Sequence, residues 1–461
     1  MNYHTQIHLL PPELLSLVFT QACLSEERME IKLSRICRQW RCIALSSSDL
    51  WSSFTYCDRL PEANRFSTYL ERSGDYPLDL RLNIQFKDRS ALTEQLLAKA
   101  MEHVSRWRRF SLVVHEDSWP ADDPFALLAD VRAPYLEWFE VFTLGSWEQG
   151  YEHPTDPFRY LFKGGAPLLS CVKLDSNSME GCMPMSNITE LEIESGIVDR
   201  IKPFSDFLCL FSLPLIHLSL VGTFLVPPTT EHRRVMAATL NTFRCSDVYV
   251  GEYFWQYLHA PQLEVLIIQD NGSGYWSIGN GPSPPLFPSL RILSLINCAI
   301  RDFDQFLPLA HATRYITHLY VSHSYNRPNN IDVLHCMAKN SPQTIPWPHL
   351  KTLTYMLLEF GDYDLDQAVD VDFSSFLEFF ETRSEHLNTR CILELQPAEV
   401  NSWKKHYPES WNRLRDGGFY QEMQPRGENA ARYVPCPPTR FEAVHGTSED
   451  PFLDFSTTIY A

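Results

Sequence analysis

The chain has 461 residues, more than one ordinary hydrophobic core organises, so its length indicates two or three domains or an elongated array of repeats. Its 44% hydrophobic and 13% aromatic residues, set against 21% charged residues, exclude a chain that is disordered along its length. The formal net charge of -18 repels phosphate backbones and anionic lipids, which argues against nucleic acid and membrane surfaces as principal partners.

Targeting signals and paired cysteines are not apparent in the sequence. The first residues, MNYHTQIHLLPPE, show no basic segment followed by an apolar one, and no stretch reaches the roughly 18 apolar residues that span a bilayer. The 12 cysteines never form a C-x-x-C pair, and most lie within apolar runs, as reduced core thiols do. We therefore expect a soluble intracellular protein, cytoplasmic or nuclear.

Two amphipathic helices are predicted near the N-terminus. The prolines at 11–12 suit the first turn of a helix, and apolar residues recur with helical spacing through 14–22. A second helix is predicted over 33–44, where an apolar side faces a side rich in arginine. A short third turn follows at 48–51. Helices this short are marginal alone, so they need each other or a partner.

The succession LPPELL at 10–15, LSRICRQWRCIAL at 33–45 and DLW at 49–51 resembles the F-box, in the form common among fungal F-box-like proteins. The resemblance covers about residues 7–54 and implies docking onto a Skp-type adaptor of a cullin-based ubiquitin ligase. The expected adaptor-binding residues are Leu10, Pro11, Leu14, Leu15, Val18, Phe19, Ile36, Cys37, Trp40, Leu50 and Trp51. The alternative is that the tryptophans only form the core of a small helical cap.

A Leu-x-x-Leu-x-Leu frame, with aliphatic or aromatic substitutes, recurs through most of the remaining chain. Its first positions are 136, 169, 188, 215, 240, 263, 290, 316 and 350, so most steps span 19 to 27 residues. Leucine-rich repeats have periods of about 20 to 29 residues. Weaker copies near 106 and 389 extend the array, and amphipathic helices are predicted at 90–104 and 372–387. Because such units stack one strand each, we expect a parallel sheet in a curved solenoid.

Residues beside the frame leucines are predicted to form an outward face of the sheet, because alternate residues of a strand point to opposite sides. This face is acidic in the first half of the array and apolar or aromatic in the second half, as a partner surface would be. The expected substrate-binding residues are Trp138, Glu190, Glu192, His217, Arg244, Ile267, Ile292, His318 and Tyr320. In two alternatives, the segment 441–460 folds over this strip, or its apolar residues are buried between layers.

Catalytic chemistry is not indicated. The sequence contains no H-E-x-x-H, G-x-S-x-G or P-loop motif. The glycines of 271–285 run into PSPP and do not open a helix, which favours a loop over a phosphate site. The aspartates of 362–372 have calcium-loop spacing but lack Gly at the sixth position and Glu at the twelfth. We therefore expect no cofactor, no metal site and no catalytic residues.

The expected fold class is α/β, with a short α-helical F-box hairpin followed by a leucine-rich-repeat-like solenoid with a parallel sheet. The expected parts are an F-box-like domain at 1–55, a helical linker at 56–105, repeats with a C-terminal cap at 106–420 and a tail at 421–461. Together they predict a non-enzymatic substrate-recognition adaptor of a Skp-cullin-F-box ubiquitin ligase, which binds a Skp-type adaptor within the cullin complex and a protein substrate. The alternative is a leucine-rich scaffold that binds proteins without assembling a ligase.

Overall fold

The computed structural model describes residues 7, 10–25, 28–57, 63–84, 90–115, 128–144, 161–175, 185–194, 202–203, 209–221, 225–226, 235–245, 258–269, 287–296, 298, 303–324, 345–358, 373–387, 390–395 and 397–422. The chain divides into two compact units, and the boundary falls between Ile188 and Thr189. Both units combine helices with parallel strands, which confirms the expected α/β class, the N-terminal helices and the parallel pairing of many strands.

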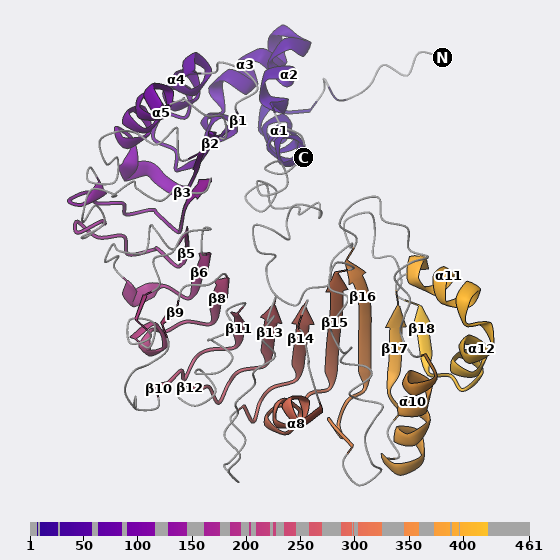
Figure 1. The fold of residues 1–461 in the computed structure, drawn as a ribbon. Helices are drawn as coiled ribbons and strands as arrows, with labels where there is room; N and C mark the ends of the chain where they lie inside the picture. The colour runs from indigo at the N-terminus through magenta and orange to yellow at the C-terminus, as the bar shows by residue number, and fades with distance from the viewer. Residues whose placement is uncertain are drawn as a thin grey trace, which may run out of the picture. The chain divides into compact units, whose positions relative to one another are not determined.

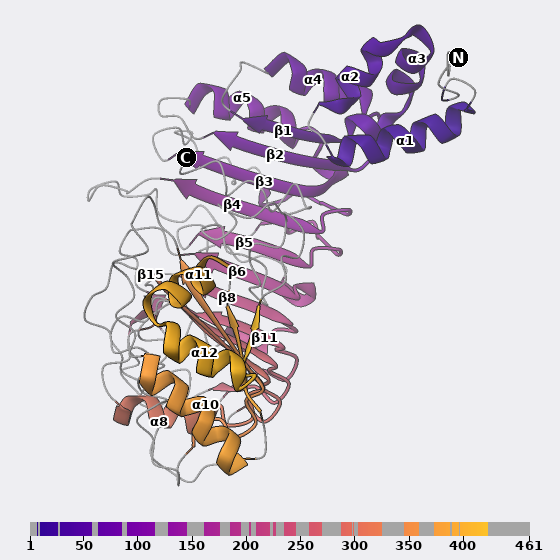
Figure 2. The same cartoon turned by 90° about the vertical axis from the view of Figure 1, so that its right-hand side faces the viewer.

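The first unit begins with helices and continues into five parallel strands. Its helices are α1 (Pro12–Ser25), α2 (Met29–Ile36), α3 (Arg38–Ser46), α4 (Ala63–Arg72) and α5 (Ser90–Met101), with short 3-10 turns η2 (Ser48–Trp51), η3 (Val104–Arg106) and η7 (Met185–Asn187). Its strands are β1 (Ser53–Cys57), β2 (Leu78–Ile84), β3 (Trp107–His115), β4 (Trp138–Leu144) and β5 (Cys171–Asp175), paired in that order. Figure 2 shows α4 and α5 along one side of these strands.

The helix predicted over 33–44 is interrupted, which corrects the sequence-based expectation. Cys37 has an extended backbone, with φ -154° and ψ 173°, and separates α2 from α3. Its thiol accepts the backbone N–H of Trp40 at 3.4 Å and so caps the start of α3. The break turns one predicted helix into two, and the hairpin therefore contains three helices before η2.

The core of the first unit lies on one side of its strands. Leu82, Leu112, Val141 and Leu174 stand at matching register positions on four neighbouring strands, and all four are buried. The predicted linker at 56–105 contributes more than helices, because β2 lies within it and pairs with both β1 and β3. The helical hairpin and the first repeat-like strands are consequently parts of the same compact unit.

The second unit contains nine further strands in one parallel set. In pairing order they are β6 (Glu190–Glu194), β8 (His217–Val221), β11 (Thr242–Cys245), β13 (Val265–Gln269), β14 (Ile292–Ile296), β15 (His318–Ser324), β16 (Thr352–Leu358), β17 (Ile392–Leu395) and β18 (Tyr420–Glu422). Figure 1 shows β13 to β18 side by side. Two small parallel pairs join β7 (Lys202–Pro203) to β9 (Leu225–Val226) and β10 (Val235–Met236) to β12 (Leu258–His259), and η8 spans Cys209–Ser212.

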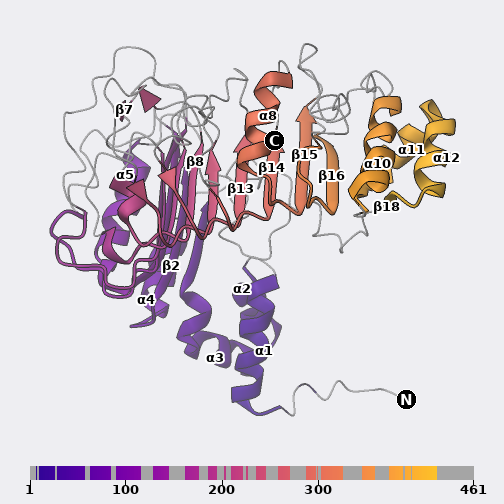
Figure 3. The same ribbon diagram turned by 90° about the horizontal axis from the view of Figure 1, so that it is seen from below.

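Helices follow the later strands of the second unit. They are α8 (Phe303–Ala312), α10 (Phe373–Leu387), α11 (Pro397–His406) and α12 (Pro408–Asp416). Figure 3 shows α10, α11 and α12 gathered at the end of the unit that carries β18. The buried guanidinium of Arg383 on α10 donates to the carbonyls of Pro346 and Trp347, both at 2.8 Å, and so fixes the turn that leads into β16.

Each of the nine predicted frames supplies a strand, and the first frame residue lies buried just before it in every case. These residues are Leu136, Leu169, Ile188, Leu215, Leu240, Leu263, Leu290, Ile316 and Leu350. The hydrogen bonding also repeats. The carbonyl just before β8, that of Ile216, accepts the N–H groups of Asn241 and Thr242 at the start of the next strand, and the Asn241 carbonyl accepts those of Glu264 and Val265 in turn.

Three sequence features fall outside the described residues: the glycine-rich stretch 271–285, the aspartates of 362–372 and the tail from 423 onward. Among the helices that are described, none combines the length and the apolar character needed to cross a lipid bilayer.

Candidate functional site

Helix α1 carries apolar side chains on two sides. Leu15 and Phe19, four residues apart, are fully buried. Leu14, Leu17 and Val18 recur at the helical spacing i, i+3 and i+4 and stay exposed, with 47%, 66% and 44% of their surface accessible. One side of α1 therefore closes the core of the hairpin, and the other presents leucine and valine to solvent.

Two more exposed apolar residues belong to the same hairpin. Ile36 ends α2 and is 55% exposed, and Leu45 lies near the end of α3 and is 41% exposed. Together with Leu14, Leu17 and Val18 they form what we term the hairpin apolar surface. These five are half of the ten large apolar side chains that remain exposed in the described parts of the chain. Such a concentration within about 35 residues is typical of a surface that another protein covers.

The tryptophans lie inside the unit. The rings of Trp40 and Phe19 have centroids 4.8 Å apart, and both side chains are buried. The Trp51 indole N–H donates to the Ala44 carbonyl at 2.7 Å, and its ring meets the edge of Tyr69 on α4 at 5.1 Å. Trp40 and Trp51 therefore hold the helices of the hairpin together, and Trp51 attaches the hairpin to α4.

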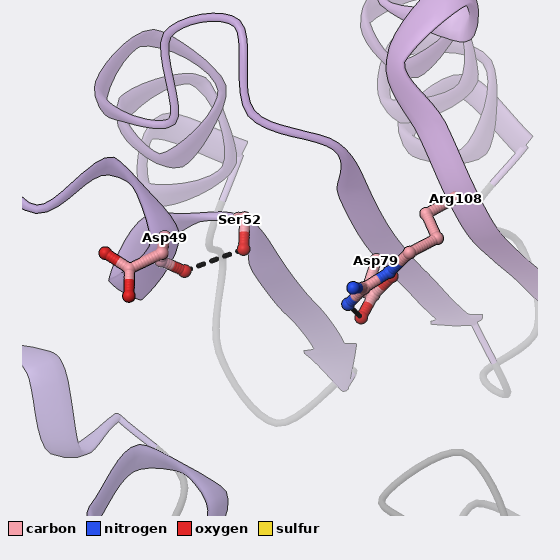
Figure 4. Close-up of polar contacts among 4 residues, drawn as sticks. All are labelled: Asp49, Ser52, Asp79 and Arg108. Atoms are coloured by element: carbon pink, nitrogen blue, oxygen red, sulfur yellow. Dashed lines mark hydrogen bonds and ion pairs between the residues drawn. The ribbon is translucent and has the colours of Figure 1, made fainter. Parts of the chain in front are cut away.

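Polar contacts fix the hairpin to the strands. The Thr20 hydroxyl of α1 donates to Asp49 Oδ2 at 2.8 Å, and the Ser52 hydroxyl donates to the Asp49 carbonyl at 2.7 Å. The Ser52 carbonyl in turn accepts the backbone N–H of Asp79 on β2 at 2.9 Å, and the Asp79 carboxylate pairs with Arg108 on β3 (Figure 4). A chain of contacts therefore runs from α1 through η2 to the second and third strands.

A buried carboxylate makes the second attachment. The phenol of Tyr69 on α4 donates to Glu30 Oε1 on α2, and both side chains are buried. Burial, with the Glu30 charge as the next contribution, raises the pKa of Tyr69 well above its ordinary value, so the phenol remains a donor. The contact between α2 and α4 joins residues 39 positions apart.

The structure divides the predicted adaptor-binding residues into two groups. Pro11, Leu14, Val18 and Ile36 are exposed, and Leu10 and Cys37 are partly buried. The other five are buried within this chain, contrary to the expectation that they face an adaptor: Leu15, Phe19, Trp40, Leu50 and Trp51. Sequence reasoning missed Leu17 and Leu45, although the density of apolar residues over 14–19 exceeds what one stripe of a helix buries.

The predicted substrate-binding residues lie on the strand face opposite the leucine core. Five of them are partly buried: Trp138, Glu190, His217, Ile292 and His318. The other four are almost fully buried, contrary to the expectation of an exposed strip: Glu192, Arg244, Ile267 and Tyr320. Arg244, on β11, donates to the Gln269 side chain on the neighbouring strand β13.

The apolar part of this face is a small core of its own. Val265, Ile267 and Ile296 form a buried cluster against which Ile292 packs. Val265 and Ile292 stand at matching register on neighbouring strands, about 4.8 Å apart, and Ile267 lies between Arg244 and Ser294. These apolar residues are therefore buried, where an exposed strip was expected.

Within the described residues, no group of three or more His, Cys, Asp and Glu side chains has the arrangement of a metal site. Seven of the described cysteines are free thiols: Cys23, Cys37, Cys42, Cys171, Cys245, Cys298 and Cys391, of which the last four are buried. The sequence matches no known family model, and no curated protein is significantly similar to it.

Proposed function

We propose that this chain is a substrate-recognition adaptor of a Skp-cullin-F-box ubiquitin ligase, in which the hairpin binds a Skp-type adaptor and the strand units bind a protein substrate. The observation that carries the proposal is the hairpin apolar surface. The core of the hairpin is already closed by Phe19, Trp40 and Trp51, so the exposed leucines are not needed to complete it. Their burial by a partner removes apolar area from water and favours association.

The rigid attachment of the hairpin supports the same function. Contacts from Thr20 to Asp49 and from Glu30 to Tyr69 fix α1 to η2 and α2 to α4. A ligase adaptor must hold its substrate at a defined position relative to the rest of the ligase, and a rigid joint provides that positional control.

We also propose that the strands belong to a degenerate leucine-rich-repeat solenoid. Support comes from the buried first frame residues and from the recurring hydrogen bonds in which the carbonyl just before one strand accepts two N–H groups at the start of the next. Stacked repeats of this kind present an extended strand face on which a protein partner can bind. On this proposal the solenoid recognises the substrate, and the ligase supplies the chemistry.

Affinity purification from cells tests the ligase assignment. We expect the wild-type chain to co-purify a Skp-type adaptor and a cullin, identified by mass spectrometry. The double variant Leu14→Glu, Leu17→Glu should lose both proteins, because it introduces two carboxylates into the hairpin apolar surface. Leu168→Glu is the matched control, since Leu168 is 49% exposed in the same unit but lies outside the hairpin.

The outcomes separate the two functions considered. If wild type and Leu168→Glu co-purify the adaptor and the double variant does not, the ligase assignment stands. If wild type binds other proteins but neither a Skp-type adaptor nor a cullin, the chain is a scaffold that does not assemble a ligase.

A further inference from the structure

A row of polar side chains crosses the first unit on the face opposite its leucine core. Arg81, Ser111, Glu140 and Lys173 stand at matching register positions on β2, β3, β4 and β5, and Asn83 lies two residues beyond Arg81 on the same face. We term these five residues the polar row. Their side chains are directed away from the leucines, because alternate residues of a strand face opposite sides.

Three members of the polar row, Asn83, Ser111 and Glu140, are buried, and each has a polar atom without a hydrogen-bond partner in the described structure. Ser111 is fully buried, Asn83 is 2% exposed and Glu140 is 8% exposed. Glu140 Oε2, Ser111 Oγ and Asn83 Oδ1 have no hydrogen-bond partner among the residues that the structure describes. Buried polar atoms are almost always paired, and an unpaired oxygen of a buried carboxylate is especially costly. Three such atoms on three adjacent strands are therefore the pattern of a site that a ligand completes.

The chemistry of the row restricts the ligand. Glu140 and Asn83 Oδ1 need hydrogen-bond donors, and the Ser111 hydroxyl can accept or donate. Lys173 stands beside Glu140 on β5, and Arg81 lies two strands from Glu140 on β2, so a cation in the row meets two positive charges. An anion in the row is repelled by the Glu140 carboxylate. A neutral group that offers both donors and acceptors matches the unpaired atoms of Glu140, Asn83 and Ser111, and the peptide main chain is such a group, with one N–H and one C=O in each residue.

The neighbouring register position provides an aromatic contact. Trp138 precedes Glu140 on the same face of β4 and is partly exposed. The Lys173 ammonium lies 4.9 Å from the centre of the Trp138 ring, which holds the indole beside the polar row. A partly exposed aromatic side chain next to buried polar groups is typical of a ligand-binding site.

We propose that the polar row is a peptide-binding site, at which main-chain N–H groups of an extended, unmodified peptide donate to Glu140 and Asn83 and side chains of the peptide pack on Trp138. The site itself follows from the polar row alone. That the peptide belongs to a substrate for ubiquitination rests on the proposed function.

A phage-displayed library of random dodecapeptides, selected on the full-length protein, supplies the probe. We expect selected peptides whose affinity, measured by fluorescence anisotropy, falls about ten-fold or more in Glu140→Leu, because a buried hydrogen bond to a charged group is lost. The matched control is Glu137→Leu, since Glu137 is exposed and lies three residues earlier. It should bind as wild type does.

Thermal melting of the free protein accompanies the titration. Replacing Glu140, a buried carboxylate with one unpaired oxygen, with leucine should leave the melting temperature unchanged or raise it. If Glu140→Leu melts well below wild type, Asn83→Ala replaces it in the titration, since Asn83 is the other proposed acceptor, and a loss of affinity is again expected.

The proposal is overturned if no peptide is selected, or if the selected peptides bind wild type and the polar-row variants equally. Co-purification of the Skp-type adaptor is measured on the same variants and should be unchanged, because the polar row and the hairpin apolar surface share no residue. Peptide binding without any adaptor binding would support the polar row as a peptide-binding site and would contradict the ligase assignment.

Discussion

Truncation of Leu17 to alanine should weaken adaptor binding and leave the stability of the fold almost unchanged. Leu17 has 66% of its surface accessible, so the isolated protein buries little of it. Full burial of a leucine side chain is worth about 1.5–3 kcal/mol, and burial of the exposed two-thirds by a partner is therefore worth about 1–2 kcal/mol. That free energy corresponds to a loss of adaptor affinity of roughly 5- to 30-fold in Leu17→Ala. A surface substitution changes the free energy of unfolding by less than about 0.5 kcal/mol.

Trp40→Ala is the contrasting variant. Trp40 is 8% exposed and packs against Phe19, so its truncation should lower the free energy of unfolding by about 3–5 kcal/mol. Urea denaturation measures the unfolding of both variants, and isothermal titration with a recombinant Skp-type adaptor measures their binding. The reasoning is refuted if Leu17→Ala binds the adaptor as tightly as wild type, or if it is as unstable as Trp40→Ala.

Three further predictions concern buried groups. Tyr69→Phe should lower the free energy of unfolding of the first unit by about 1–3 kcal/mol in urea, because Glu30 loses its buried donor. Tyr76→Phe, at an exposed tyrosine, is the control and should have little effect. Equal stabilities of the two variants would mean that the Glu30 contact contributes nothing. Arg383→Met should lower the stability of the second unit by about 3 kcal/mol, because it leaves buried turn carbonyls without a donor, and a wild-type denaturation curve would contradict this. Burial raises the pKa of the Cys391 thiol from 9.0 to about 12, so the folded chain keeps a proton that the unfolded chain releases. Stability should therefore fall as pH rises from about 9 to 12, and melts in a pH series should show a shallower fall in Cys391→Ala.

The strands were predictable because each carries its own signal. The buried residue that opens each frame, such as Leu215 or Leu263, recurs at a spacing close to one repeat, and the strand follows two residues later. The break at Cys37 was not predictable from apolar periodicity, since the pattern continues across it and a local thiol contact to the Trp40 N–H starts a new helix.

The candidate site was predictable only in part. Periodicity indicates that α1 is apolar, but α1 has two apolar sides, and the sequence does not specify which of them faces the core. Burial of Leu15 and exposure of Leu14 and Leu17 are decided by contacts with distant segments. The same limit applies to Ile267, whose burial depends on Ser294 and Arg244 on the strands at either side, each more than 20 residues away.

Site-specific photo-crosslinking tests the central claim most directly. A photoreactive amino acid replaces Leu17 in one variant and Leu168 in another, and each full-length protein is irradiated in the presence of a Skp-type adaptor. We predict that position 17 captures the adaptor and that position 168 does not. Failure at both positions, or capture at 168 alone, would contradict the assignment of the hairpin apolar surface as the adaptor-binding site.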